Sequence, residues 1–256
     1  MYWIDTHAHL AEEEFNDDIQ DVILRAKEVG VGCILLIGVG VNGAKRALAL
    51  AQSDPIFKVA VGFHPEEVDS IEKSDWPIMI EMMEKKEVIA IGEIGLDHYW
   101  VKDHDVHKRQ EELFIKQIEI ANQLHKPILV HMRDASEITL KILREHRAIE
   151  RGILHCYSGS LEMAKEFVKS GYDISLAGPV TFKNAHTPKE VAKEIDLNHL
   201  HIETDAPYLS PTPHRGKRNE SSYVVETASV IANLREIPLE NLKKACYQNF
   251  QRLFKL

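Results

Sequence analysis

Hydrophobic and polar positions follow two alternating patterns along this chain. Short runs rich in β-branched residues are typical of buried parallel strands, and the longer stretches between them repeat apolar residues every three or four positions, as helices packed on a sheet do. The strand-like runs are residues 2–4, 32–39, 58–62, 88–92, 127–130, 152–154, 172–176 and 200–202. The helix-like stretches include residues 16–29, 43–52, 71–85, 107–124, 135–144 and 161–169.

This alternation predicts an α/β fold, a single (β/α)8 TIM barrel of parallel strands. The length of 256 residues fits one such barrel, and no linker or break in composition divides the chain. We therefore expect one barrel domain over residues 1–256, ending in two further helices within residues 221–256 that separate near Pro238. A doubly wound open sheet is the structural alternative, and it requires a reversal of strand order.

Composition narrows the class of protein. With 44% hydrophobic and 28% charged residues, the chain is neither disordered nor collagenous. The net charge of −9 argues against a protein that coats nucleic acid through a broad basic surface. Cys33, Cys156 and Cys246 lie far apart without a C-x-x-C pair, which favours a reducing cytoplasmic setting over a disulfide framework. No apolar run is long enough to span a bilayer, so we expect no membrane association, and nothing indicates an obligate protein partner.

Metal-binding residue types recur where the predicted strands end. In TIM barrels the chemistry lies at the carboxyl ends of the strands. A single histidine after a strand is more often a structural residue, but repeated placement at the same topological position favours a shared site. The residues in question are His7, His9, His64, Glu93, His131, His155 and Asp205.

The spacing of His7 and His9 has a physical reason. In an extended segment, residues two positions apart point to the same side, so both imidazoles can reach one ion. Four histidines with two carboxylates suit Zn²⁺ or Mn²⁺, and Mg²⁺ less well. Six ligands exceed what one tetrahedral ion needs, so we expect two divalent ions that share a bridging carboxylate.

The motifs at these strand ends resemble the ordered signatures of the TatD family of metal-dependent deoxyribonucleases. The resemblance spans nearly the whole chain and keeps the family's order. The matching segments are Asp5-Thr6-His7-Ala8-His9-Leu10, Gly62-Phe63-His64-Pro65, Gly92-Glu93-Ile94-Gly95-Leu96-Asp97, His131-Met132-Arg133, His155-Cys156-Tyr157-Ser158-Gly159 and Glu203-Thr204-Asp205-Ala206-Pro207-Tyr208. One departure follows the last strand, where Ser221 stands in place of the proline common in the family.

The resemblance implies an amidohydrolase-like TIM barrel and a role for each ligand. His7 and His9 would bind one ion with Asp205, and His131 and His155 would bind the other. Glu93 would bridge the two ions. The implied activity is hydrolysis of DNA phosphodiester bonds, in the 3′-to-5′ direction from strand ends.

Besides the bridging Glu93, which belongs to the catalytic set, two residues receive catalytic roles. Asp205 is our candidate for the base that accepts a proton from the attacking water. His64 lies at a strand end outside the ligand set, where it can hydrogen-bond a phosphate oxygen or assist the leaving group. The alternative for His64 is a structural capping histidine before Pro65.

Candidate substrate contacts lie near the same strand ends. Arg215 and Lys217 belong to a basic segment, residues 213–219, after the last strand, and we expect them to contact phosphates, although a solvated charged face is the alternative. Arg133 is a second phosphate candidate, with a salt bridge to Asp134 or a neighbouring acid as its alternative. Lys183, in the loop after the seventh strand, is more simply a solvated lysine.

Aromatic residues also follow the strands. Tyr99, Trp100 and Tyr208 can stack on unpaired bases, whereas Tyr157 fits the core equally well.

The leading functional hypothesis is a deoxyribonuclease that acts on single-stranded DNA or frayed ends. A second is another hydrolysis on the same scaffold, by an amidohydrolase or an aminoacyl-tRNA deacylase, since a two-metal site suits carbonyl and phosphoryl centres alike. A third is a metal-bound interaction protein without catalysis, and the complete ligand set argues against it.

Overall fold

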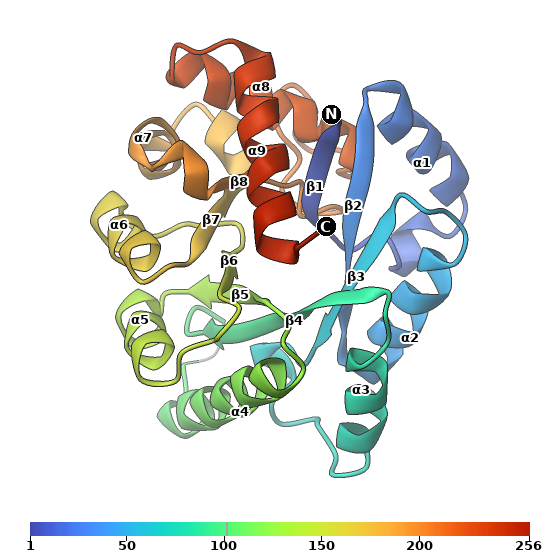
Figure 1. Cartoon of the computed structure of the whole chain (residues 1–256), viewed down its shortest axis with the longest axis vertical. Coiled ribbons are helices and arrows are strands. Elements are labelled where there is room, and N and C mark those ends of the chain that lie inside the picture. Colours follow the sequence, from blue (N-terminus) through green and yellow to red (C-terminus); the bar gives the residue numbers. More distant parts are fainter. Residues whose placement is uncertain (101) are drawn as a thin grey trace.

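The strands form a nearly closed parallel barrel (Figure 1). The computed structural model describes residues 1–100 and 102–256, and in this part of the chain eight strands pair in sequence order. They are β1 (Trp3–Ala8), β2 (Val31–Val39), β3 (Phe57–Gly62), β4 (Val88–Asp97), β5 (Ile128–Arg133), β6 (Gly152–Leu154), β7 (Asp173–Leu176) and β8 (Leu200–Ile202). Because the order never reverses, the doubly wound alternative is excluded and the TIM-barrel prediction is confirmed.

Helices follow the strands and cover the outside of the barrel (Figure 1). They are α1 (Ile19–Glu28), α2 (Gly40–Ala51), α3 (Asp75–Met83), α4 (His104–Gln123), α5 (Ser136–Glu145), α6 (Leu161–Lys169), α7 (His186–Glu194), α8 (Val224–Leu234) and α9 (Leu239–Phe254). The two predicted terminal helices are present, and Pro238 lies between them. Helix α7 lies outside the helix-like stretches named above because it buries only Val191 and Ala192, too short an apolar stripe to detect.

Three strands extend beyond the apolar runs that predicted them. Strand β1 continues through His7, β4 through Asp97 and β5 through Arg133. The added residues include polar ones, which hydrophobic periodicity cannot recognise, yet strand pairing holds them: Gly95 pairs with His131 and Asp97 with Arg133. His7, Glu93 and His131 therefore lie on strands.

The barrel closes where its first and last strands meet. The main-chain N–H of His9 donates to the carbonyl of Ala206 at 2.7 Å, and the N–H of Asp205 donates to the carbonyl of His7 at 2.9 Å. Asp5 supports the same seam by accepting hydrogen bonds from the main chain and hydroxyl of Thr204 at 2.9 and 2.6 Å. The seam thus brings together two segments that both carry candidate ligands.

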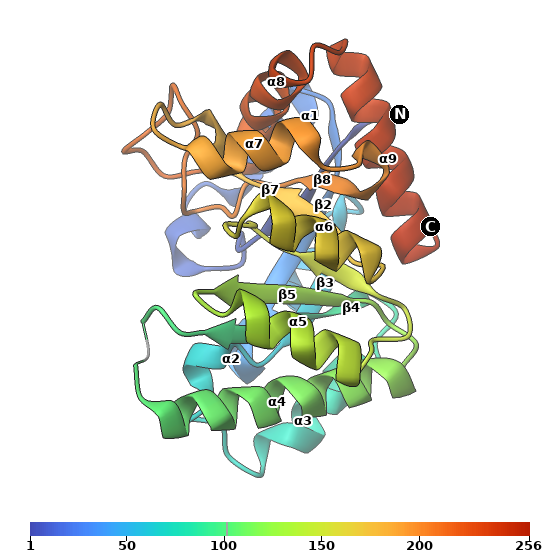
Figure 2. The same cartoon turned by 90° about the vertical axis from the view of Figure 1, so that its left-hand side faces the viewer.

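The amino end of the barrel is closed by apolar packing. Phe250 and Phe254 of α9 join the inward-facing side chains of the strands in one buried cluster, which includes Ile4, Leu35 and Leu129. Figure 2 shows both chain termini on this side, and the loop after β8 projecting on the opposite side, toward which β5 points. The carboxyl end is left for the polar side chains. In the described residues, no helix has the length and hydropathy needed to cross a membrane.

Candidate metal centre

The six predicted ligands converge at the carboxyl end of the barrel. His7 comes from β1, Glu93 from β4 and His131 from β5, while His9, His155 and Asp205 directly follow or lie just beyond strand ends. All are buried except His131, which is half-buried. Polar groups held out of water in this way need partners, and here they find them chiefly in one another.

Glu93 occupies the middle of the cluster. Its Oε1 lies 2.7 Å from Nδ1 of His131 and 2.7 Å from Nε2 of His155. Its Oε2 lies 3.2 Å from Nε2 of His7 and 3.5 Å from Nε2 of His9. The two oxygens of one carboxylate therefore face two different pairs of imidazoles.

Asp205 lies on the side of the first pair. Its Oδ1 is 3.7 Å from Nε2 of His7 and 3.6 Å from Nε2 of His9. The backbone of Asp205 is left-handed, with φ of 57°, which aspartate tolerates better than most residues but still at a cost. Such a conformation at the barrel seam is typical of a functional position.

Close approach of two strands positions His131. A β-carbon on Gly95 would lie 2.0 Å from the carbonyl oxygen of His131, and φ of Gly95 is +141°. Only glycine lets β4 and β5 approach in this way. The approach places the imidazole of His131 beside Glu93.

Charge and burial act against each other in the cluster. Burial alone would raise the pKa of Glu93, but the charges of His155, His64 and His7 hold this pKa well below its usual range. Burial likewise opposes ionisation of Asp205, while a hydrogen bond with His9 and the charges of His7 and His155 lower its pKa. The site therefore holds two ionised carboxylates among imidazoles, an arrangement that attracts cations.

The donor atoms fit divalent ions. Nε2 of His7 and Nε2 of His9 are 3.2 Å apart, and Nδ1 of His131 and Nε2 of His155 are also 3.2 Å apart. Nitrogens this close must share a proton or face a common cation. Imidazole nitrogen with carboxylate oxygen is a donor set suited to Zn²⁺ and Mn²⁺. Within residues 1–100 and 102–256, three overlapping groups could hold an ion: His7, Glu93 and His155; His7, His9 and Asp205; and His64, Glu93 and His131.

His64 has two contacts. Its Nδ1 accepts a hydrogen bond of 3.3 Å from the main chain of Glu66, so it caps the short helix η2 (Pro65–Glu67), as the alternative interpretation held. Its Nε2 lies 3.4 Å from Oε1 of Glu93. The capping contact thus aims Nε2 of His64 at the metal centre. The sequence had placed His64 outside the ligand set, yet its ring reaches Glu93.

Two buried acids that received no role from the sequence hold the second pair of imidazoles. Oδ2 of Asp97 lies 3.1 Å from Nε2 of His131, and Oε1 of Glu203 lies 3.4 Å from Nδ1 of His155. Acids behind metal-binding histidines fix the ring orientation and tautomer. The signal was available, since both residues belong to the quoted motifs, but periodicity does not reveal which side of an imidazole an acid contacts.

The predicted phosphate contacts lie at the mouth of the barrel. Arg133 is exposed at the end of β5, and its guanidinium carbon lies 4.1 Å from the ring centre of Tyr99 and 5.3 Å from that of Trp100. Among the described residues these two rings are the contacts of the Arg133 guanidinium, and no salt bridge joins it to Asp134 or to another acid. Arg133 thus keeps its charge available beside two exposed aromatic rings.

The cations of the basic segment, residues 213–219, are of two kinds. One is held in an ion pair, and the others are exposed. Arg218 binds the carboxylate of Asp18 at 2.9 and 2.6 Å, which ties the segment to α1. Arg215 stacks on Phe182 at 3.9 Å and remains exposed, as does Lys217. Arg215 and Lys217 are therefore the cations that can reach a ligand.

Ser221 does not loosen the chain that follows. Glu220 binds Arg25 of α1 at 2.8 and 2.6 Å, and the short helix η5 (Ser221–Tyr223) leads directly into α8. Paired charges thus hold this segment, where the family commonly has proline.

The aromatic residues that follow the strands include both exposed and buried rings. Tyr99, Trp100 and Tyr208 are 42%, 63% and 50% exposed, so part of each ring is accessible to a ligand. Tyr157 is buried and packs against Phe167, which makes it part of the core. The core interpretation of Tyr157 is therefore the correct one.

The barrel and its histidine and carboxylate cluster define a metal-dependent hydrolase. The family model described as TatD related DNase matches residues 4–255, and the chain belongs to this family. It is 42% identical over 254 residues to a protein named uncharacterized metal-dependent hydrolase YabD of Bacillus subtilis, with 98% of each chain covered. It is 35% identical to uncharacterized metal-dependent hydrolase YcfH of Escherichia coli, covering 99% of this chain and 96% of that protein.

Solved structures of TatD-family proteins have the same fold as this chain. The crystal structure of YjjV, a TatD homologue from Escherichia coli, superposes with a TM-score of 0.93 at 29% identity, covering 99% of this chain and 98% of that one. A hydrolase of the TatD family from Entamoeba histolytica superposes with a TM-score of 0.88 at 22% identity, covering 99% of this chain and 98% of that one, a likeness of fold.

Proposed function

We propose that this protein is a deoxyribonuclease that hydrolyses DNA phosphodiester bonds with two divalent ions. The placement of Glu93 carries the proposal, because its two oxygens face two separate imidazole pairs. His7, His9 and Asp205 would hold one ion, His131 and His155 the other, and Glu93 would bridge them. Mn²⁺ and Zn²⁺ match the nitrogen donors best, and Mg²⁺ is the third candidate.

When bound, such ions lower the pKa of water and neutralise charge on a phosphodiester. The chain's own residues supply the remaining steps. Asp205 orients the attacking water and accepts its proton at the carboxylate, which its lowered pKa keeps ionised. Nε2 of His64 lies close enough to the centre to hydrogen-bond a non-bridging phosphate oxygen or the leaving oxygen.

The rim supports DNA as the substrate. Arg133, Arg215 and Lys217 are exposed cations that can bind backbone phosphates on either side of the reacting one. Tyr99 and Trp100 offer exposed rings on which unpaired bases can stack. These features favour single-stranded DNA or frayed ends, and the family's name points the same way. We propose cleavage from the 3′ end, in a cytoplasm that keeps the free thiols of Cys33, Cys156 and Cys246 reduced.

A cleavage assay tests the proposal. End-labelled single-stranded DNA is incubated with the purified protein and Mg²⁺, Mn²⁺ or Zn²⁺, with and without chelator. Shortening of the labelled strand with one of these metals, abolished by chelator and by Glu93→Gln, supports it. Turnover of an amide or aminoacyl ester substrate without DNA cleavage under any metal would instead assign the site to the amidohydrolase or deacylase class.

A further inference from the structure

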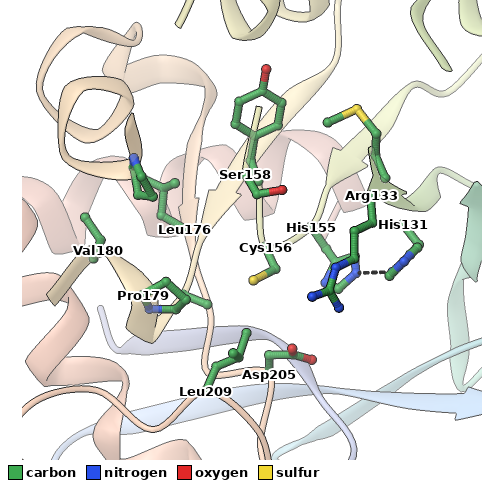
Figure 3. A pocket seen from close by; sticks show the side chains of 14 residues that line it. His131, Arg133, His155, Cys156, Ser158, Leu176, Pro179, Val180, Asp205 and Leu209 are labelled. Atoms are coloured by element: carbon green, nitrogen blue, oxygen red, sulfur yellow. Dashed lines mark hydrogen bonds between the residues drawn. The ribbon is translucent and has the colours of Figure 1, made fainter. Parts of the chain in front are cut away.

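A cavity of about 240 Å³ opens directly beside the metal centre (Figure 3). On one side it is bounded by His131, His155 and Asp205. Figure 3 shows Leu176, Pro179 and Val180 on the opposite side, with the thiol of Cys156 between the two walls. The cavity therefore joins a reactive polar wall to an apolar one.

The apolar wall comes from three elements. Leu176 ends β7, Pro179 and Val180 belong to the short helix η3 (Gly178–Thr181), and Pro188 lies in the first turn of α7. Leu209, from the loop after β8, completes it. None of these side chains carries a hydrogen-bonding group.

Close backbone contacts hold this wall in place. A β-carbon on Gly178 would lie 2.0 Å from the carbonyl oxygen of Leu209, so η3 and the loop after β8 touch through their main chains. The N–H of Thr212 donates to Oγ1 of Thr181 at 2.8 Å, linking the same two segments again. Such contacts favour a preformed cavity over one that must open for its ligand.

The chemistry of the cavity selects its occupant. A charged phosphate would lose its hydration against the apolar wall, whereas a flat and largely apolar group would gain by burial. The volume lies below that of pockets for drug-sized ligands, so the cavity suits one ring system. In a DNA strand, the groups of this size and character next to each phosphate are the bases.

We propose that this cavity binds the terminal nucleobase of the DNA strand whose reacting phosphodiester lies at the metal centre. This assignment rests on the function proposed above and deepens it. Arg133 also borders the cavity, where its guanidinium can contact the phosphate that follows the bound base. The cavity has room for one base, which in the exonuclease reaction proposed above is the base of the nucleotide that is removed.

The test compares a nucleotide with the same compound lacking its base. The binding of thymidine 5′-monophosphate and deoxyribose 5-phosphate to the metal-loaded protein is measured by calorimetry. The base should improve binding by about tenfold or more, as stacking of one base commonly does. Equal affinity for the two compounds would overturn the proposal, and so would tighter binding of an N-acyl amino acid than of the nucleotide.

Two variants narrow the cavity from two different elements of its apolar wall. Leu209→Trp places a larger side chain at a residue that is 40% exposed, so the core is little disturbed, and Pro188→Trp does the same from α7. Each should weaken nucleotide binding about tenfold and leave deoxyribose 5-phosphate binding unchanged. Leu24→Trp, at a residue of α1 that is 57% exposed, is the matched control and should change neither affinity.

Cleavage gives an independent readout. The unaltered protein should remove a normal terminal nucleotide about tenfold faster than a terminal abasic one, and Leu209→Trp should abolish this difference. DNA that is not cleaved under any metal, with base-dependent binding intact, overturns the proposed function and leaves the cavity as a base-binding site. Cleavage that is normal but indifferent to the terminal base overturns the cavity assignment alone.

Discussion

The carboxylate of Asp97 lies 3.1 Å from Nε2 of His131, on the side of the ring away from Glu93. Burial alone would raise the pKa of Asp97, but its hydrogen bond with His131 lowers this pKa, so the acid is ionised. An ionised acid accepts a hydrogen bond from the N–H group at Nε2, which keeps the ring proton there and leaves Nδ1 free to bind an ion. The tautomer of His131 is thus set by a residue that does not itself face the other ligands.

Asp97→Asn should therefore weaken metal binding by about 10- to 100-fold. The amide nitrogen of asparagine can donate to Nε2 of His131, which would move the ring proton to Nδ1 and block the ligand atom. The melting temperature of the metal-free protein should change little, because asparagine can still accept the hydrogen bonds from Tyr99 and Trp100 that Oδ1 accepts now. Calorimetric titration with Zn²⁺ or Mn²⁺ measures the affinity.

Asp103→Asn is the matched control for this variant. Asp103 accepts a hydrogen bond from the main chain of Asp105 at the start of α4, and asparagine caps helices equally well. Metal affinity should be unchanged. Unaltered affinity in Asp97→Asn as well would show that Asp97 does not select the tautomer.

Asp205→Asn and His131→Ala should each lower the turnover of DNA by at least about 100-fold. The first removes the proposed base, which is also a proposed ligand, and the second removes a proposed ligand of the other ion. Circular dichroism and melting curves should show that both variants fold. Full turnover in either variant would remove that residue from the mechanism.

Neutralising Arg215 and Lys217 together should weaken DNA binding and flatten its dependence on salt. Each phosphate contact contributes about one unit to the slope of log affinity against log salt concentration, so the slope should fall by about two. Binding titrations at several salt concentrations measure it. Lys244→Gln removes one charge from an exposed lysine of α9, so it is the control for Arg215→Gln and Lys217→Gln made singly, and it should leave the slope unchanged. A slope that the double variant also leaves unchanged would show that Arg215 and Lys217 are solvated surface cations.

Asp173 lies far from the metal centre, and its contacts lead us to expect that the folded protein becomes less stable in acid. Its carboxylate binds His199 at 2.7 Å, His201 at 2.8 Å and Arg252 at 2.7 Å. Burial opposes ionisation, but hydrogen bonds from the two histidines and the charge of Arg252 hold the pKa of Asp173 far below its usual value of 3.8. Because the pKa of Asp173 is lower in the folded state than in the unfolded state, these contacts stabilise the protein at any pH above the unfolded-state pKa. This contribution is lost as the pH falls toward the folded-state pKa.

Asp173→Asn should therefore lower the free energy of unfolding by about 2 kcal/mol near pH 7, since hydrogen bonds to a charged group are lost. The difference from the unaltered protein should shrink as the pH falls below about 4. Urea unfolding between pH 3 and pH 7 measures both. Asp69→Asn removes an exposed ion pair with Arg109 and should change little at any pH, and a gap for Asp173→Asn that stays constant with pH would contradict this account.

The fold was predictable because the core repeats one physical pattern. Each β/α unit buries an apolar strand beneath one stripe of a helix, and the two periods of this packing are visible in the sequence. The positions of His7, Glu93 and His131 followed from the topology, since parallel strands bring their carboxyl ends to one place. Their partners Asp97 and Glu203 belong to the quoted motifs, but periodicity could not assign their roles, because an acid contacts one side of a ring through geometry rather than spacing.

The cavity beside the centre shows a second limit. Leu176, Val180 and Leu209 resemble core residues in the sequence, and only their meeting across three elements makes a wall. The ion pair of Arg218 could not be predicted for the same reason, because its partner Asp18 lies 200 positions away in the chain. Long-range pairing of this kind leaves no local periodicity.

The seam between β1 and β8 links metal binding to the completeness of the barrel. His7 and His9 lie on one side of the seam and Asp205 on the other, and the main-chain hydrogen bonds from His9 and Asp205 hold it closed. An ion held by residues on both sides of the seam stabilises the closed barrel. By the same free energy, closure of the barrel increases the affinity for the ion. The exchange of the His9 and Asp205 amide protons with solvent thus becomes a gauge of metal occupancy, readable without substrate.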